Sequence, residues 1–355
     1  MKTLRNVAMI LFFLIAALIV TVCCIYNYQL KPVDKKSTEE IVVVIPSGTP
    51  TKKIGEILEK EELIKSAQFF YIYCKLYEVN DIKATTYTLT KAMSLEDIVE
   101  ILREGNTYNP DQITIRFVEG ISFKTIASTI NNNTNNKYED ILKLGSDEKY
   151  LDELIAKYWF LTDEIKNKDV YYPLEGYLFP DTYKFSGKDV TTKEIFTKML
   201  DRTKQILDKY KDDIEKSKYS VREIITLASI IEKEGKTDDF TNISSVFHNR
   251  LDINMKLESC ATTYYGKGLD FNETGIATSE MIADINPYNT YKVEKLPIGP
   301  ISSPGEKAIQ AALYPEQTKN LFFLSDKNGK TYFFETLDAH AKKKQELIAT
   351  GNFYR

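Results

Sequence analysis

A run of apolar residues between Ser220 and Gly235 is the clearest pattern along the chain. Ser220 followed by Glu223 has the spacing of a capping box, which starts a helix, and Gly235 is a typical end. The apolar positions are Val221, Ile224, Ile225, Leu227, Ala228, Ile230 and Ile231. They cover nearly every face of the expected helix, which therefore should be buried inside a domain.

Shorter patterns before this helix predict small strand-and-helix units. Residues 41–45 form a β-branched run that is followed by helical spacing at residues 54–58. A second strand is expected at residues 87–89, with a helix from Ser94 that ends at Gly105. A weak echo of the first unit occurs at residues 113–130, with a strand at residues 113–118 and helical spacing at Ile126 and Ile130.

The second half of the chain also mixes strands and helices. The polar stretch at residues 131–136 predicts a loop and a soft domain boundary, and helical segments are expected over residues 141–159. Apolar runs at residues 321–324 and 331–334 flank an Asn-Gly pair, which predicts a β-hairpin. The fold class expected from these patterns is α+β.

The uncharged run at residues 7–25 is about long enough to cross a bilayer. A cleaved signal peptide is the rival interpretation, but the small residues Ala16 and Ala17 lie within the run instead of after it. A lipoprotein signal would use Cys23, which follows the bulky Val22. We therefore expect an uncleaved N-terminal anchor. Basic residues flank the run on both sides, so charge does not decide its orientation.

Composition excludes some function classes. The 355-residue chain is 43% hydrophobic, which is enough to form hydrophobic cores. Its net charge is −4, and nothing in its charge pattern indicates a nucleic-acid-binding surface. Cys23 and Cys24 fall in the apolar run, and Cys74 and Cys260 are expected to be unpaired. With only two histidines in the chain, His248 and His340, we expect no metal site, and nothing indicates a cofactor.

Two carboxylates, Glu232 and Glu234, follow the apolar helix. Glu234 shares a stripe with Leu227, Ile230 and Ile231, so desolvation and the negative end of the helix dipole should both raise its pKa. A carboxyl that stays protonated near neutral pH can act as a general acid. The alternative is that both are ordinary solvated residues of a final turn.

Five sequence strings around this helix occur in a characteristic order. They are residues 174–183 (LEGYLFPDTY), 228–234 (ASIIEKE), 246–251 (VFHNRL), 287–291 (PYNTY) and 296–305 (LPIGPISSPG). Together they closely resemble the endolytic murein transglycosylase family (MltG, or YceG-like), membrane-anchored enzymes that cut peptidoglycan glycan strands. The chain departs from the family at Cys260 and Ala261, where an Asp-Pro pair is often found.

The resemblance implies a domain order and a location. A cytoplasmic tip and transmembrane helix would occupy residues 1–30 and a linker residues 31–40. A LysM-like module, which would bind glycan or act only as a spacer, would cover residues 41–105, and a connecting unit residues 106–150. An α+β catalytic domain would fill residues 151–355 outside the cell membrane. The implied partners are glycan strands and the cell-wall synthases in the membrane.

The resemblance also implies a mechanism with a single acid/base. By the match of the motif, this residue is Glu234. It would protonate the glycosidic oxygen between MurNAc and GlcNAc, then accept the proton of the muramic acid C6 hydroxyl, which closes a 1,6-anhydro ring and limits strand elongation. Because the attacking hydroxyl is tethered to the sugar that it attacks, little orientational entropy is lost. Glu232 should point to another side of the helix.

Six further motif residues are candidates for supporting roles: Glu175, Asp181, Asn249, Arg250, Tyr288 and Asn289. The two carboxylates would line the cleft or orient the acid, or else cap a turn. Asn249 and Arg250 would position the acid or bind a peptide carboxylate, or else form a structural ion pair. Tyr288 and Asn289 would contact sugar, or else pack in the core. Two other functions stay open, a muramidase-type hydrolase and a non-catalytic scaffold for cell-wall synthesis.

Overall fold

The computed structural model describes residues 20–105, 112–269, 271 and 277–353. It divides into two compact units, Met1–Gln112 and Ile113–Arg355. No helix within the described ranges is long and apolar enough to cross a membrane. Most of the predicted anchor at residues 7–25 lies outside the described residues.

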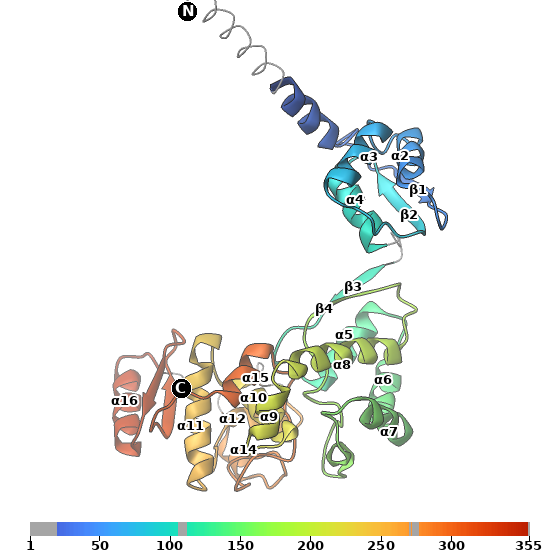
Figure 1. The fold of residues 1–355 in the computed structure, drawn as a ribbon. Helices are drawn as coiled ribbons and strands as arrows, with labels where there is room; N and C mark the ends of the chain where they lie inside the picture. The colour runs from blue at the N-terminus through green and yellow to red at the C-terminus, as the bar shows by residue number, and fades with distance from the viewer. Residues whose placement is uncertain (1–19, 106–111, 270, 272–276, 354–355) are drawn as a thin grey trace, which may run out of the picture. The chain divides into compact units, whose positions relative to one another are not determined.

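The first unit packs three helices around two antiparallel strands, and a further helix over residues 20–30 precedes them within the described residues (Figure 1). Its elements are β1 (Glu40–Val44), α2 (Thr51–Lys60), α3 (Ala67–Leu76), β2 (Thr86–Thr90) and α4 (Leu95–Glu104). The core includes Leu58, Phe70 and Tyr87, which are fully buried. The predicted capping box at Ser94 is present, and Gly105 ends α4 in the left-handed region at φ 69°. These observations confirm the elements predicted between residues 41 and 105.

The second unit holds the remaining elements around one large apolar core and a small separate cluster of Tyr264, Ala277 and Met281. They are β3 (Ile113–Arg116), α5 (Phe123–Asn133), α6 (Tyr138–Leu144), α7 (Glu148–Lys157), β4 (Thr182–Phe185), α8 (Thr192–Asp208), α9 (Lys211–Lys216), α10 (Val221–Glu234), α11 (Phe240–Asp252), α12 (Cys260–Gly266), α14 (Ser279–Ala283), α15 (Glu306–Leu313), β5 (Phe322–Ser325), β6 (Thr331–Phe334) and α16 (Leu337–Ala349). Short 3-10 helices lie at Asp163–Lys166 and Thr237–Asp239.

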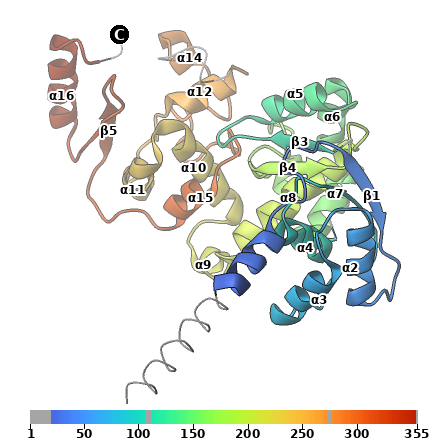
Figure 2. The ribbon, with the colours of Figure 1, turned by 90° about the horizontal axis from the view of Figure 1, so that it is seen from above.

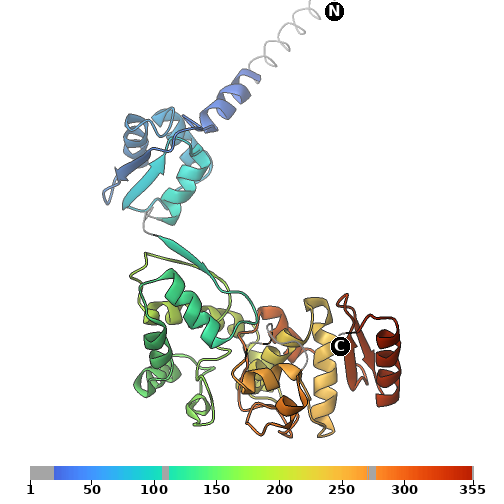
Figure 3. The ribbon, with the colours of Figure 1, turned by 180° about the vertical axis from the view of Figure 1, so that it is seen from behind.

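Helix α10 lies at the centre of this unit, as its apolar pattern predicts. The Ser220 hydroxyl and the Glu223 carboxylate form the expected capping box, and Gly235 follows the last helical turn with extended backbone. Helices α11, α12 and α15 pack against it. Figures 1 and 3 show α11 between α10 and the β5–β6 hairpin. The strand pair that was predicted around the Asn-Gly turn is therefore confirmed at the edge of the unit.

The pairing of β3 with β4 joins distant parts of the chain. Ile113 pairs with Phe185 and Arg116 with Thr182, and Figure 2 shows α5 and α8 on either side of these strands. The predicted connecting segment at residues 106–150 thus contributes to the same core as the segments after it. With three antiparallel strand pairs among helices in the described residues, the fold is α+β, as predicted.

One local prediction was wrong in part. The asparagine-rich stretch at residues 131–136 was predicted to be a loop, but its first three residues form the last turn of α5. Ile130 is buried against the core and the Asn133 side chain donates to the carbonyl of Thr129 at 2.8 Å. Tertiary packing of the apolar face therefore extends the helix through residues of poor intrinsic propensity.

Candidate active site

Glu234 is the last residue of α10, and its carboxylate caps the start of α12. The Ser259 hydroxyl donates a hydrogen bond to Glu234 Oε1, and the backbone N–H of Ala261 donates another. Burial raises the pKa of the Glu234 carboxyl above its usual range, against the opposing effects of these two donors and the Arg250 charge. The residue keeps part of its surface open to solvent. A protonated Glu234 could therefore give up its proton to a bound molecule and remain hydrogen-bonded as a carboxylate.

The motif at residues 287–291 positions Ser259. The Ser259 backbone N–H donates to Thr290 Oγ1 at 2.9 Å, and the Thr262 hydroxyl lies 2.8 Å from the same oxygen. Thr290 and Thr262 are completely buried. Ser259 is thus held by a rigid polar network, which fixes the hydroxyl that contacts Glu234.

Arg250 supports the same segment from the other side. Its guanidinium donates to the carbonyls of Lys256 and Leu257, each at 3.0 Å, and lies 3.4 Å from the Glu258 carboxylate. The side chain is largely buried, and its charge favours the ionised form of Glu234. The guanidinium Nε also donates to the carbonyl of Leu321 at 2.6 Å. Arg250 therefore holds the chain before Ser259 in place, which is compatible with the predicted positioning role.

Glu232 lies on another side of α10. It accepts a hydrogen bond at 3.0 Å from the backbone N–H of Gly305, and burial raises the pKa of its carboxyl. It lines a hollow of about 520 Å³ together with Glu119 and Asp181. The two glutamates at the end of α10 therefore face different surroundings, as their spacing predicts.

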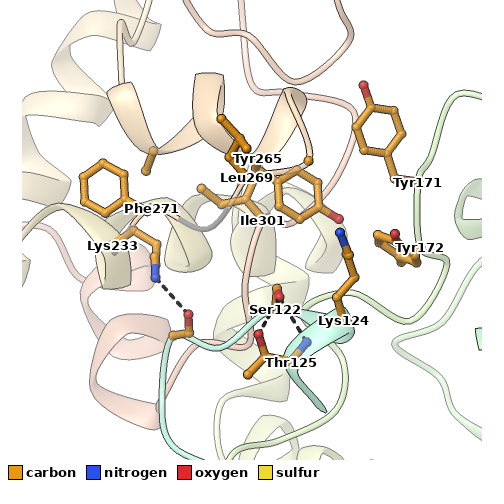
Figure 4. Close-up of a pocket in the computed structure, with 13 residues that line it drawn as sticks. Ser122, Lys124, Thr125, Tyr171, Tyr172, Lys233, Tyr265, Leu269, Phe271 and Ile301 are labelled. Atoms are coloured by element: carbon orange, nitrogen blue, oxygen red, sulfur yellow. Dashed lines mark hydrogen bonds between the residues drawn. The ribbon is translucent and has the colours of Figure 1, made fainter. Parts of the chain in front are cut away.

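A cavity of about 290 Å³ lies beside the end of α10 (Figure 4). It is lined by Gly120, Ser122, Lys124, Thr125, Tyr171, Tyr172, Lys233, Ala261, Tyr265, Gly268, Leu269, Phe271 and Ile301. Glu234 is not itself a lining residue. Ala261 both lines the cavity and donates to the Glu234 carboxylate, so the acid lies directly beside the cavity wall.

Glu175 lies next to this cavity, in contact with Tyr265. Its oxygens accept from the Phe123 backbone N–H at 2.9 and 3.0 Å, and Tyr265, which lines the cavity, donates its hydroxyl to Glu175 at 3.0 Å. The side chain is 1% exposed, and this burial raises its pKa to about 8, although the two donors oppose the shift. Glu175 therefore fixes the start of α5 and the Tyr265 ring, and is mostly protonated at neutral pH.

The other predicted site residues lie apart from Glu234. Asp181 pairs with Arg202 at 2.9 Å and accepts from the Thr182 N–H. Asn249 donates to the carbonyls of Thr318 and Asn320 and so ties α11 to the chain before β5. The contacts of Asp181 and Asn249 thus hold parts of the fold together.

Tyr288 and Asn289 are both fully buried. The Tyr288 ring packs against Tyr171 and Tyr265, with centroids 4.7 Å apart in both pairs, and its hydroxyl accepts from the Tyr171 N–H. The Asn289 amide donates to three carbonyls, of which that of Asp284 is nearest at 2.6 Å. Tyr288 thus supports the cavity wall from behind, and Asn289 holds the loop around α14.

Several residues of the site were missed in the sequence. Ser259 is a short polar residue without a local pattern. Thr290 lies in the motif at residues 287–291, but only its contact with Ser259 in the fold indicates a role. Tyr171, Tyr172 and Tyr265 carried a usable signal, because tyrosines near a candidate acid are suited to contact sugar rings. No group of three or more His, Cys, Asp or Glu side chains that could hold a metal ion occurs in the part of the chain that the structure describes.

Comparisons with known proteins agree on one family. The model of the YceG-like family matches residues 43–346. An endolytic murein transglycosylase of Bacillus subtilis strain 168 is 35% identical over 325 residues, which are 91% of this chain and 89% of that protein. One of Streptococcus pneumoniae serotype 2 is 32% identical over 361 residues, which are 96% of this chain and 65% of that longer protein. The crystal structure of a yceG-like protein from Listeria monocytogenes is 38% identical, with a TM-score of 0.62, and the match covers 87% of this chain and all of that one.

Proposed function

This chain belongs to the YceG-like family, and from that membership we infer that it is an endolytic murein transglycosylase, an enzyme that cuts peptidoglycan glycan strands internally. The match to relatives with this name extends over nearly the whole chain. The inference is carried to particular atoms by the carboxyl of Glu234. This residue keeps part of its surface open to solvent, and the pKa of its carboxyl is raised by burial, which suits a general acid.

We propose that Glu234 donates its proton to the glycosidic oxygen between MurNAc and GlcNAc. The bond from C1 of MurNAc to that oxygen breaks, and GlcNAc leaves with the proton. The Glu234 carboxylate, stabilised by the Ser259 hydroxyl and the Ala261 N–H, then accepts the proton of the MurNAc C6 hydroxyl. The C6 oxygen bonds to C1 and closes a 1,6-anhydro ring, so the acid regains its proton and no water is consumed.

The arrangement favours this reaction over hydrolysis by two carboxylates. An ordinary glycosidase places a second carboxylate across the scissile bond from the acid. The two candidates for this role are otherwise engaged in the fold, since Glu175 binds the start of α5 and Asp181 pairs with Arg202. An attacking hydroxyl that belongs to the substrate removes the need for such a group.

The nature of the products tests this function. Uncrosslinked glycan strands digested with the full chain should yield internal cuts and new 1,6-anhydro-muramic ends, measured by mass spectrometry. The same digestion in heavy-oxygen water should leave the new ends unlabelled. Incorporation of the label would show that water attacks, and the enzyme would then be a muramidase-type hydrolase.

We further propose a location and a role for the first unit. The uncharged run at residues 7–25 would anchor the chain in the cell membrane, with the N-terminus cytoplasmic and the second unit outside, near the synthases that make the strands. The order of strand, two helices and strand from β1 to β2 supports a LysM-like module. Intact-mass measurement of the native protein should find a chain that begins before residue 7. A mature chain that begins at Cys23 or later would contradict the anchor.

A further inference from the structure

Two lysines give the cavity beside Glu234 a positive character. In Figure 4 Lys124 extends to the side of the cavity that Tyr172 and Tyr265 form, and Lys233 lies on the opposite side beside Phe271. Aromatic rings and a few cationic groups are suited to a sugar that carries negative charge. No Asp or Glu is among the lining residues.

Lys124 lies at the N-terminal end of α5, where the helix dipole disfavours a positive charge. It is the second residue of α5, whose first turn contains no acidic residue. The start of a helix carries partial positive charge, so a lysine there costs free energy compared with a neutral or acidic residue. Lys124 has no hydrogen-bond or ion-pair partner among the described residues, and its side chain is exposed. A residue that opposes local electrostatics without a compensating contact is expected at functional sites.

Lys233 adds to this charge from the end of α10. Its ammonium donates to the carbonyl of Gly120 at 3.1 Å and lies 5.9 Å from the centre of the Phe271 ring. It forms no ion pair within the described ranges, and the carboxyls on which its charge acts, Glu175 and Glu232, both have raised pKa values through burial. Glu175 in particular is mostly neutral near pH 7, so it does not cancel the lysine charge.

We propose that Lys124, assisted by Lys233, binds a carboxylate carried by the muramyl residue of the strand, and that this contact places the neighbouring glycosidic bond at Glu234. This inference rests on the proposed function and adds one requirement to it, namely a carboxylate on the muramyl residue next to the bond that is cut. The carboxylate could belong to the stem peptide or, where the peptide has been removed, to the free lactyl group. Both offer the same anionic acceptor to a lysine ammonium.

Kinetics of the full chain on three substrates test the proposal. The substrates are strands with peptide stems, strands stripped by an amidase so that the lactyl carboxylate is free, and peptide-bearing strands whose carboxylates have been amidated. Lys124→Met is compared with Lys124→Arg, which keeps the charge, and with Lys149→Met, which removes an exposed lysine of α7 as a matched control. Circular dichroism checks that each variant is folded.

Lys124→Met should raise KM about tenfold with little change in kcat, the effect of losing one charge-assisted hydrogen bond. Lys124→Arg and Lys149→Met should stay near the wild type. Amidated strands should raise the wild-type KM to a similar extent, and Lys124→Met should add nothing further on them. A Lys124→Met penalty on peptide-bearing strands alone would identify the stem carboxylate, and one on stripped strands the lactyl group.

An unchanged KM for Lys124→Met on both charged substrates would overturn the proposal, as would an equal penalty on amidated strands. Cleavage by the wild-type chain is measured in the same experiment. A failure of the proposed function can therefore be distinguished from a failure of the inference about Lys124. If the wild type cut none of the three substrates, the proposed function itself would be contradicted, and this inference with it.

Discussion

At the scale of single residues, the acid depends on the hydroxyl beside it. The hydrogen bond from Ser259 favours the ionised form of Glu234 and so lowers its pKa, although burial outweighs this effect. Ser259→Ala should therefore raise the pKa of Glu234 further. Because a general acid must be protonated, the fall of kcat/KM at high pH should move to higher pH, which a pH–rate profile measures.

Ser302→Ala is the matched control for this prediction. Ser302 is equally buried and donates its hydroxyl to the Ser229 carbonyl of α10, away from the acid. Its variant should keep the position of the high-pH limb. A Ser259→Ala profile that fell at the same pH as the wild type would mean that this limb does not report Glu234.

Glu175 should make the fold less stable as the pH rises. Its pKa is about 8 in the folded chain, whereas the ordinary value is 4.5. Between these values the folded state holds a proton that the unfolded state has lost, so the free energy of unfolding decreases with increasing pH. Glu232 and Glu234 contribute in the same direction.

Glu175→Gln keeps the shape of the side chain and removes its ionisation. The decrease in unfolding free energy between about pH 5 and about pH 8, measured by urea denaturation, should be smaller in this variant. An identical pH dependence in the two proteins would show that Glu175 is ionised in the folded state throughout this range.

At the scale of elements, Gly176 joins the motif at residues 174–183 to helix α10 and to the motif at residues 296–305. It has φ +82°, and a Cβ built there would overlap the Pro300 ring and lie 3.2 Å from Ile225. Gly268 has a similar φ of +70°, but no described atom lies within 4 Å of its Cβ position. The two glycines therefore separate backbone strain from close packing.

Gly268→Ala should lower the free energy of unfolding by about 1 kcal/mol, the cost of a left-handed conformation for a residue with a side chain. Gly176→Ala should lower it by about 1–3 kcal/mol more, because the overlap with Pro300 adds to that cost. Chemical denaturation measures both. Equal losses in the two variants would show that the Gly176 contact relaxes without cost.

Local signals in the sequence predicted helices and strands better than they predicted contacts between residues far apart in the chain. The capping box and apolar run were sufficient for α10, and the Asn-Gly pair for the β5–β6 hairpin, because these patterns act over a few neighbouring residues. The pairing of β3 with β4 and the contact of Ser259 with Glu234 join residues far apart in sequence. No periodicity encodes such contacts, so the motif around Glu234 was found but its partners were not.

At the scale of the whole molecule, the two units have separate cores and should unfold as separate cooperative transitions. Leu58 of the first unit and Leu200 of the second are both fully buried. Leu58→Ala should destabilise only one calorimetric transition and Leu200→Ala only the other, each by about 2–5 kcal/mol. A single transition that both variants shift would indicate that the units unfold together.

The central claim, that Glu234 carries the reaction, is tested most directly by the initial rate of strand cleavage in Glu234→Gln and Glu232→Gln. Both changes keep side-chain size and remove a carboxyl whose pKa is raised by burial, but only Glu234 is bound by Ser259 beside the cavity. Glu234→Gln should reduce the rate by about 10²–10⁴-fold or more, while Glu232→Gln should stay close to the wild type. A nearly normal rate for Glu234→Gln together with an inactive Glu232→Gln would contradict the account.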